Sequence, residues 1–400
     1  MTQHRLSALT RRMLDDAGLP VSEPMACGLG GGIGFLYAIF EYKGVDHPLL
    51  TIVAQHHPQP WLEAVAQHLN SARPTVELTA VTSSTAKAAL AKLDTTLDAK
   101  LDTVILDTTP GTPTPAWITV GRGGLPWHDL PAGPLAEAEA ADPYPVVVTR
   151  AEIPRSYLID DADGAPHTLT ADELAAAWSL HKKGKFAIET LAPADSVAPA
   201  NPTTPAAPLA ITADVVRASV ATTIAHLTGP VIHHAFDTNF GFSGMRKLAT
   251  ELRDDRTKSG WRRRFGDEAA FGVGMLRLAE CLTWAHTAAG GTRPLFAEFL
   301  REAAELLPAG ERDVWREAAT AADAAGTTWT LVADTAAAAA TAATPATATG
   351  PAANPATDPA ANPTADPATT FDTLATLVEQ AIEHEELMVA LLEGSLTRGA

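Results

Sequence analysis

The sequence predicts an α+β domain, then an all-α helical domain, a disordered Ala/Thr/Pro spacer and a C-terminal helix. Strand and helix patterns mix over residues 1–191, whereas residues 209–333 carry helical periodicity almost throughout. Two Pro/Ala-rich stretches break the pattern, a linker at 192–208 and the spacer at 334–370. The chain closes with apolar residues at helical spacing over 371–400.

The first domain reads as one N-terminal helix followed by an antiparallel sheet. We expect helices at 6–16, 60–69, 84–97 and 169–179, and strands at 48–53, 103–106, 144–148, 156–159 and 185–189. Thr170, followed three residues later by Glu173, forms the capping box that opens the last of these helices. This succession is typical of α+β organisation.

The linker and the second domain differ sharply in composition. The linker LAPADSVAPANPTTPAAP cannot hold a helix, because proline removes a backbone donor and clashes with the preceding turn. After it, Ala/Leu-rich segments predict helices at 214–227, 243–253, 266–288, 293–306 and 311–334. Helices of this length with short connections predict a bundle.

The spacer has too few large apolar side chains to offset the entropy of ordering it. Its repeated NPAT and DPAA units present no face that could pack, so they do not indicate a solenoid. In the final helix the leucines and isoleucines fall on one stripe. Either this stripe docks on the rest of the chain, or it joins two copies into a homo-oligomer.

Composition and charge exclude several classes of protein. The net charge of −18 argues against general nucleic-acid binding, which needs basic surface. Basic runs at 11–12, 182–185, 246–247 and 262–264 read as solvated helix ends or as local patches. No apolar run reaches the roughly 20 residues of a membrane span, and no apolar stretch follows the basic start as in a signal peptide. We expect a cytoplasmic protein without membrane contact.

The glycine-rich run CGLGGGIGF is the most conspicuous motif, but its spacing fits no nucleotide fingerprint. The third glycine of a dinucleotide loop is replaced by Ile33 or Phe35, and no Gly-Lys-Ser/Thr follows for a P-loop. We interpret the run as a tight backbone segment beside a cleft, with positive φ angles that glycine tolerates. No cofactor is expected.

Thiols, histidines and acids give weaker signals. Cys27 and Cys281 both lie among apolar residues, where a buried structural cysteine is the expected reading. The adjacent histidine pairs at 56–57 and 233–234 lack metal-ligand spacing, so no metal is expected. Asp160 and Asp161 end a strand before a turn, where an acid either forms the turn or orients a catalytic base.

Four segments together resemble the butirosin biosynthesis protein H-like family. The opening HRLSALTRRMLDDAGLPVSEPMACGLGGGIGFLY is similar to the family's start, and residues 103–107 and YPVVVTRAEIPRSYLIDD are similar to its strands. NFGFSGMRKLATELRD and GGTRPLFAEFLREAAELL resemble the helical domain of unknown function that usually follows. The resemblance spans about residues 5–332 in the expected order.

This resemblance implies a papain-like fold that takes an acyl group from a carrier-protein thioester onto cysteine and passes it to an amine. The chain departs from the family at two of the three triad positions. Arg5 stands where the family has its cysteine, and Tyr144 and Pro145 stand where it has its histidine. The acid survives as Asp160 or Asp161. Arginine stays protonated and cannot be a nucleophile, although it can bind an anion.

These departures lead to one main hypothesis. The protein acts in natural-product biosynthesis on a carrier-tethered or released acyl, polyketide or peptide intermediate, by noncovalent cyclisation or condensation in a repurposed acyltransferase cleft. The partner is an acyl carrier protein or a small acyl molecule. The predicted catalytic residues are His4, Arg5, Tyr144 and Asp160, and the predicted substrate-binding residues are Cys27, Gly28, Gly30, Gly32 and Phe35.

Two alternatives stay open. In the first, Cys27 carries the acyl group, with a base such as His4 beside it. In the second, the chain is catalytically inactive and binds a carrier protein or an active relative through its basic runs and its last helix.

Overall fold

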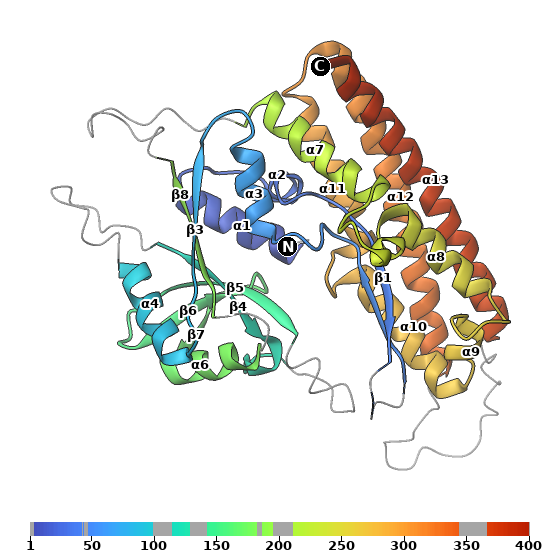
Figure 1. Ribbon diagram of the computed structural model, residues 1–400, viewed down its shortest axis with the longest axis horizontal. Coiled ribbons are helices and arrows are strands. Elements are labelled where there is room, and N and C mark those ends of the chain that lie inside the picture. Colours follow the sequence, from blue (N-terminus) through green and yellow to red (C-terminus); the bar gives the residue numbers. More distant parts are fainter. Residues whose placement is uncertain are drawn as a thin grey trace, which may run out of the picture. The chain divides into compact units, whose positions relative to one another are not determined.

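The computed structural model describes residues 4–41, 43, 47–98, 114–128, 142–181, 186–194, 211–343 and 366–399. Its internal contacts divide the chain into two units (Figure 1). The first unit comprises residues 1–30 and 59–219, and the second comprises residues 31–58 and 220–400. The strand expected at 103–106 lies outside the described residues, so that expectation stays untested.

The first unit contains the α+β part of the chain. Its helices are α1 (Arg5–Asp16), α2 (Glu23–Leu29), α3 (Trp61–Leu69), α4 (Ala86–Asp98), η1 (Arg122–Gly124) and α6 (Ala171–Leu180). The capping box at the start of α6 is confirmed, because Thr170 and Glu173 bond reciprocally to each other's backbone N–H. The helix α2 was not predicted, although Ser22 caps it and Pro24 stands in its first turn.

A six-stranded antiparallel sheet forms the other layer of this unit. Its strands are β3 (Val76–Val81), β4 (Ala116–Gly121), β5 (Pro143–Arg150), β6 (Ser156–Asp160), β7 (His167–Thr170) and β8 (Ile188–Pro193). Their order across the sheet is β3-β8-β4-β5-β6-β7. One face packs on α4 and α6 through a core that includes Val146, Val148, Ile159 and Leu174. The expected α+β class is thereby confirmed.

The second unit is a helical bundle that includes one β-hairpin. Its elements are β1 (Leu36–Phe40), β2 (Leu49–Val53), η2 (Ala235–Asn239), α8 (Gly241–Arg253), α9 (Trp261–Arg264), α10 (Glu268–Thr283), η3 (Ala289–Thr292), α11 (Arg293–Ala304), α12 (Ala309–Ala343) and α13 (Pro367–Gly399). The helix α7 (Ala213–Thr228) contributes its first half to the first unit and its second half to this one.

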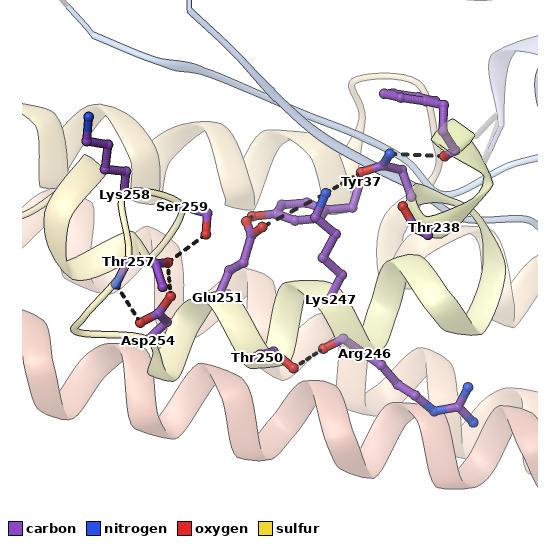
Figure 2. A network of polar contacts seen from close by, with 12 residues as sticks. Tyr37, Thr238, Arg246, Lys247, Thr250, Glu251, Asp254, Thr257, Lys258 and Ser259 are labelled. Carbon is purple, nitrogen blue, oxygen red and sulfur yellow. Dashed lines mark hydrogen bonds and ion pairs between the residues drawn. The ribbon is translucent and has the colours of Figure 1, made fainter. Parts of the chain in front are cut away.

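The hairpin β1–β2 belongs with the helices, whereas the sequence placed it in the first domain. Leu36 and Val53 form an apolar cluster with Phe240, and β2 packs on α10. The polar side of the contact is a network on α8 (Figure 2). There Tyr37 donates to Glu251 Oε2 over 2.6 Å. Apolar and polar contacts both hold the hairpin to the bundle, so the units are interleaved in sequence.

The linker and spacer boundaries also differ from those predicted. Ala192 and Pro193 extend β8 instead of opening the linker, with Pro193 at the strand end opposite Val76. The helix α12 continues ten residues beyond 333, to Ala343, and α13 already begins at Pro367. Alanine has the highest helix propensity, and the side chain of Ala336 is fully buried in the bundle. Residues 344–365 lie outside the described residues.

The C-terminal helix docks on its own chain, which answers the choice that the sequence left open. Figure 1 shows α13 running along α12, and it also packs on α8. Phe371, Leu374, Val378 and Leu392 are fully buried, so the stripe predicted for self-association is occupied within the chain. A buried ion pair between Arg293 and Glu385 fixes the helix further.

Candidate functional site

The candidate site lies in the first unit, where the N-terminal end of α1 meets the first residues of β5. Arg5 Nη1 donates to the carbonyl of Pro145 over 2.6 Å. The guanidinium carbon of Arg5 stands 3.7 Å above the ring centroid of Tyr144. Burial lowers the pKa of Arg5, while Tyr144 and Asp161 act in the opposite sense. Two of the predicted residues, Arg5 and Tyr144, are therefore in direct contact.

The register of the sheet brings Asp161 to the same face as Tyr144. Val148 pairs with Ile159 and Val147 pairs with Asp160. Because successive side chains alternate between faces, Asp161 follows Ile159 onto the face of Tyr144, while Asp160 points to the other face. The carboxylate of Asp160 accepts only from the backbone N–H of Ala162, over 2.9 Å, among the described residues. The acid of the cluster is therefore Asp161, and Asp160 is a turn former.

Asp161 is held as a buried carboxylate. Its side chain is 2% exposed, and its Oδ2 accepts from Trp127 Nε1 over 2.7 Å and bonds His128 Nε2 over 3.1 Å. Burial by itself raises the pKa of Asp161, but the bonds from His128, Trp127 and the Asp163 backbone outweigh it and lower the pKa to about 2. Asp161 is therefore ionised throughout the physiological pH range.

His128 completes the cluster as an oriented imidazole. Its ring lies edge-on to Tyr144, with the centroids 4.9 Å apart. Bonding through Nε2 to a permanent carboxylate makes Nδ1 the basic nitrogen of the neutral ring. His128 therefore has the geometry of a general base.

Tyr144 contacts both Arg5 and His128. Burial raises the pKa of Tyr144, with the positive charge of Arg5 opposing the rise. The phenol therefore stays protonated at neutral pH and can donate a hydrogen bond or a proton. Together the cluster offers a base, an acid and a desolvated cation beside one another, which are the groups that stabilise a developing oxyanion without a covalent step.

His4 lies at the N-cap of α1 but outside the cluster. It is 1% exposed, and its Nδ1 shares a 2.7 Å hydrogen bond with Ser7 Oγ. Its backbone N–H donates to Glu23 Oε1 over 2.6 Å, and its ring packs edge-on against Trp61. These contacts tie α1 to α2 and α3, which gives His4 a structural place.

Cys27 is fully buried inside α2. Burial raises the pKa of its thiol to about 12, although a hydrogen bond from Ser7 opposes the rise. Ser7 therefore stands between Cys27 and His4. A thiol with this pKa is protonated at neutral pH and has little of the thiolate that attacks a thioester.

The glycines that we predicted to bind substrate serve the packing of the chain. Gly28 belongs to α2, and its carbonyl accepts a hydrogen bond from Ser219 Oγ. A Cβ at Gly30 would lie 2.1 Å from the indole of Trp61. Both positions are buried, and at Gly30 glycine is needed for the close approach of the backbone to Trp61.

The rest of the glycine-rich run, from Gly31 onward, belongs to the second unit. Gly31 and Gly32 have φ angles of +96° and +66°, as the glycine run predicted. A Cβ at Gly32 would lie 2.5 Å from Phe296, and the ring of Phe35 stacks on Trp329 with the centroids 5.3 Å apart. Gly32 and Phe35 are thus core residues of the bundle.

The polar network of Figure 2 is the main alternative cluster. Tyr37 accepts from Trp261 Nε1 over 2.8 Å as well as donating to Glu251, and burial raises its pKa well above the usual value. Lys247 bonds Asn239 Oδ1 over 2.8 Å on the same helix face. Tyr37 is 1% exposed. Because its hydroxyl is buried and hydrogen-bonded to both Glu251 and Trp261, Tyr37 holds β1 to α8, and we assign it no catalytic role.

One arginine of each basic run in the second unit pairs with α13. Arg246 pairs with Glu386, and Arg262 pairs with Asp372 over 2.9 Å. Arg253, which belonged to no predicted run, pairs with Glu379. These runs therefore read as solvated helix surface that neutralises the acidic face of α13.

His128 and Trp127 are the site residues that the sequence did not indicate. They follow η1 in the stretch GRGGLPWHD, where glycine and proline suggest a turn and no motif marks a base. His128 and Asp161 lie 33 residues apart in the sequence, and the fold brings them together. The pairing of β5 with β6 was predictable in kind, but its register, which selects Asp161 over Asp160, was not.

Comparison with known proteins bears on the second half of the chain. Residues 182–363 match a family described as a domain of unknown function, DUF4872. The match includes α7 to α12 and confirms the predicted helical domain of unknown function. No curated protein matches the chain. Within the described ranges, no cluster of three His, Cys, Asp or Glu side chains is arranged for a metal ion, and no helix has the length and apolarity to cross a bilayer.

Proposed function

We propose that this protein acts in natural-product biosynthesis, on an acyl, polyketide or peptide chain held as a carrier thioester or already released from it. The first unit is an acyltransferase-like, papain-like domain of the butirosin biosynthesis protein H-like kind. Its triad is replaced by a noncovalent acid–base site of Arg5, Tyr144, Asp161 and His128.

One observation carries this proposal. The positions that the resemblance gives to the nucleophile, the base and the acid are Arg5, Tyr144 or Pro145, and Asp160 or Asp161. Of these, Arg5 and Tyr144 are in direct contact, and Asp161 is close enough to raise the pKa of Arg5. They come from α1, β5 and the end of β6, more than 130 residues apart at the extremes. His128 then supplies an imidazole from a different segment, bonded to the surviving acid. The positions of a catalytic triad are kept while their side chains differ from the family's, and this supports a different reaction at the same site.

The chemistry that fits is proton transfer with anion stabilisation. His128 Nδ1 takes a proton from the reacting group, while Asp161 stabilises the imidazolium. Arg5 and Tyr144 hold the oxyanion or enolate that develops at the substrate carbonyl. The group that has lost its proton then adds to a carbonyl of the same chain or of a second acyl molecule, which forms the new bond. Where that carbonyl is a thioester, its C–S bond breaks and the thiolate leaves with the proton from His128; where it is a ketone, the alkoxide takes that proton. No acyl-enzyme forms.

The alternative route through Cys27 is disfavoured by the buried thiol with a pKa of about 12. For an inactive carrier-binding role, Arg246 and Arg262 in the described basic runs of the second unit give little support, because both pair with α13. The imidazole of His128, bonded to Asp161, supports an active site.

The test is a product assay with matched variants. A panel of acyl-pantetheine thioesters, including β-ketoacyl chains, is incubated with the native protein and analysed by liquid chromatography and mass spectrometry. We expect Arg5→Ala and His128→Gln to lower turnover by about 100-fold or more. Arg11→Ala, an exposed change on the same helix as Arg5, controls for loss of charge. Unchanged turnover in Arg5→Ala and His128→Gln would refute the assignment.

A further inference from the structure

Two ring N–H groups meet at one oxygen of Asp161. Trp127 Nε1 and His128 Nε2 both bond Oδ2, over 2.7 and 3.1 Å. The other oxygen, Oδ1, accepts the backbone N–H of Asp163 over 3.0 Å. With both oxygens bonded from fixed directions, the carboxylate cannot turn about its Cβ–Cγ bond without losing a partner.

The indole of Trp127 is itself fixed from the sheet. His167 stacks face to face on it, with the centroids 3.9 Å apart and the planes 6° from parallel. His167 is the first residue of β7 and pairs with Ile159 on β6. Trp127, in the stretch after η1, is thus aligned by His167 on the paired strand β7, and a paired strand is more rigid than a loop.

We propose that Trp127 and His167 are positioning residues: the stacked pair holds the Asp161 carboxylate in the orientation in which it orients His128. This inference rests on the proposed function, because it assigns the stacked pair to the same acid–base site. Without the indole N–H, Asp161 would keep only its bonds to His128 and to the Asp163 backbone, so the carboxylate would be held less firmly and would orient His128 less well.

A tryptophan of the same core shows what a merely structural indole looks like here. Trp178 on α6 is 2% exposed, packs edge-on to Phe186 at 5.6 Å, and contributes apolar area to the sheet–helix core. Trp127, by contrast, is half-buried and directs its one polar atom at the acid of the cluster. Trp178→Phe is therefore a matched control for Trp127→Phe.

The direct test follows the titration of the Asp161 carboxyl carbon by ¹³C NMR in the full chain. Trp127 is one of the donors that lower the pKa of Asp161 to about 2, so Trp127→Phe should move the midpoint upward by a measurable shift. Trp178→Phe should leave it in place. His167→Ala should give an intermediate rise, and His167→Phe, which keeps a flat ring on the indole, should reverse most of it.

The second readout is catalysis with the acyl-pantetheine panel. Trp127→Phe should lower kcat by about tenfold with little change in KM, because in this proposal the indole acts through Asp161 and His128. An Asp161 midpoint that stays near 2 in Trp127→Phe, or that rises equally in Trp178→Phe, overturns the proposal. If no thioester is turned over at all, the proposed function fails while the ¹³C titration still decides the role of Trp127.

Discussion

At the scale of single residues, the lowered pKa of Asp161 makes the stability of the fold depend on pH. Its pKa falls from 3.8 unfolded to about 2 folded. A depressed folded pKa stabilises the native state above the unfolded pKa, and this stabilisation is lost as the pH falls from about 4 towards 2. At about 1.4 kcal/mol per pKa unit, the contribution at neutral pH is on the order of 2 kcal/mol.

Asp161→Asn should therefore lower the free energy of unfolding at pH 7 by on the order of 2 kcal/mol. The difference between the two proteins should shrink as the pH approaches 2, where the native carboxyl is also protonated. Urea unfolding at several pH values measures this. Asp163→Asn, an exposed change two residues away, should stay within about 0.5 kcal/mol of the native protein. A pH-independent loss in Asp161→Asn would contradict the assigned carboxylate.

Cys27 gives a second residue-scale prediction. With a fully buried thiol and a pKa of about 12, it should resist iodoacetamide at pH 8 in the folded protein. Cys281 is also fully buried and should behave alike. Denatured protein should take up two labels, one per cysteine. Rapid labelling of Cys27 without unfolding would show an accessible thiolate and revive the acyl-cysteine route.

At the scale of elements, α13 depends on one buried ion pair. Arg293 and Glu385 are both fully buried and bond through two N–H groups at 2.9 Å. Arg293 also donates to the carbonyls of Gly34, Ala54 and Gly291, and Trp329 Nε1 donates to Glu385 Oε1. This network joins the hairpin, α11, α12 and α13 into one polar centre.

Glu385→Gln removes the negative partner and leaves the Arg293 cation buried. The free energy of unfolding should fall by about 3–5 kcal/mol, because an uncompensated buried charge is strongly unfavourable. Glu379→Gln breaks the pair with Arg253 on the surface and should cost less than about 1 kcal/mol. Guanidinium unfolding of both variants compares them. Equal small losses would mean that the buried pair is not the anchor of α13.

The elements also show what the sequence could and could not predict. Periodicity located α1, α3, α4, α6, α7, α8 and α11 to within a few residues, because each has an apolar stripe. The helix α2 was missed because its last three residues and its C-cap, Gly30, belong to the run that we interpreted as a glycine loop. We placed the end of α12 too early because its last turns bury alanines such as Ala336, and an alanine-rich sequence has no large apolar side chains to indicate a core.

At the scale of the whole molecule, the chain is interleaved and not a simple succession of domains. Residues 31–58 leave the first unit to join the helices, and the chain returns at residue 59. Linear composition could not reveal this, because the contacts that recruit the hairpin, such as Tyr37 with Glu251, span over 200 residues. The same limit hid His128, whose partner also comes from a distant strand.

Because α13 completes the bundle, a chain ending at residue 343 should not fold its second unit. It loses the buried Phe371 and Val378 together with the partner of Arg293. We expect loss of cooperative thermal unfolding by calorimetry and rapid proteolysis of 211–343. The double change Glu379→Gln and Glu386→Gln, which cuts surface pairs but keeps the helix, should unfold cooperatively. A truncated chain as stable as the full one would contradict the docking of α13.

The central claim is that the exchanged triad works without a covalent intermediate, and intact-mass measurement during turnover tests it most directly. The native protein is mixed with an acyl-pantetheine thioester that it consumes, and the reaction is quenched in acid at short intervals. Our account predicts product accumulation with the protein at its unmodified mass throughout, and loss of product in His128→Gln. An acyl adduct that forms and decays with turnover, on Cys27 or on any other side chain, would contradict it.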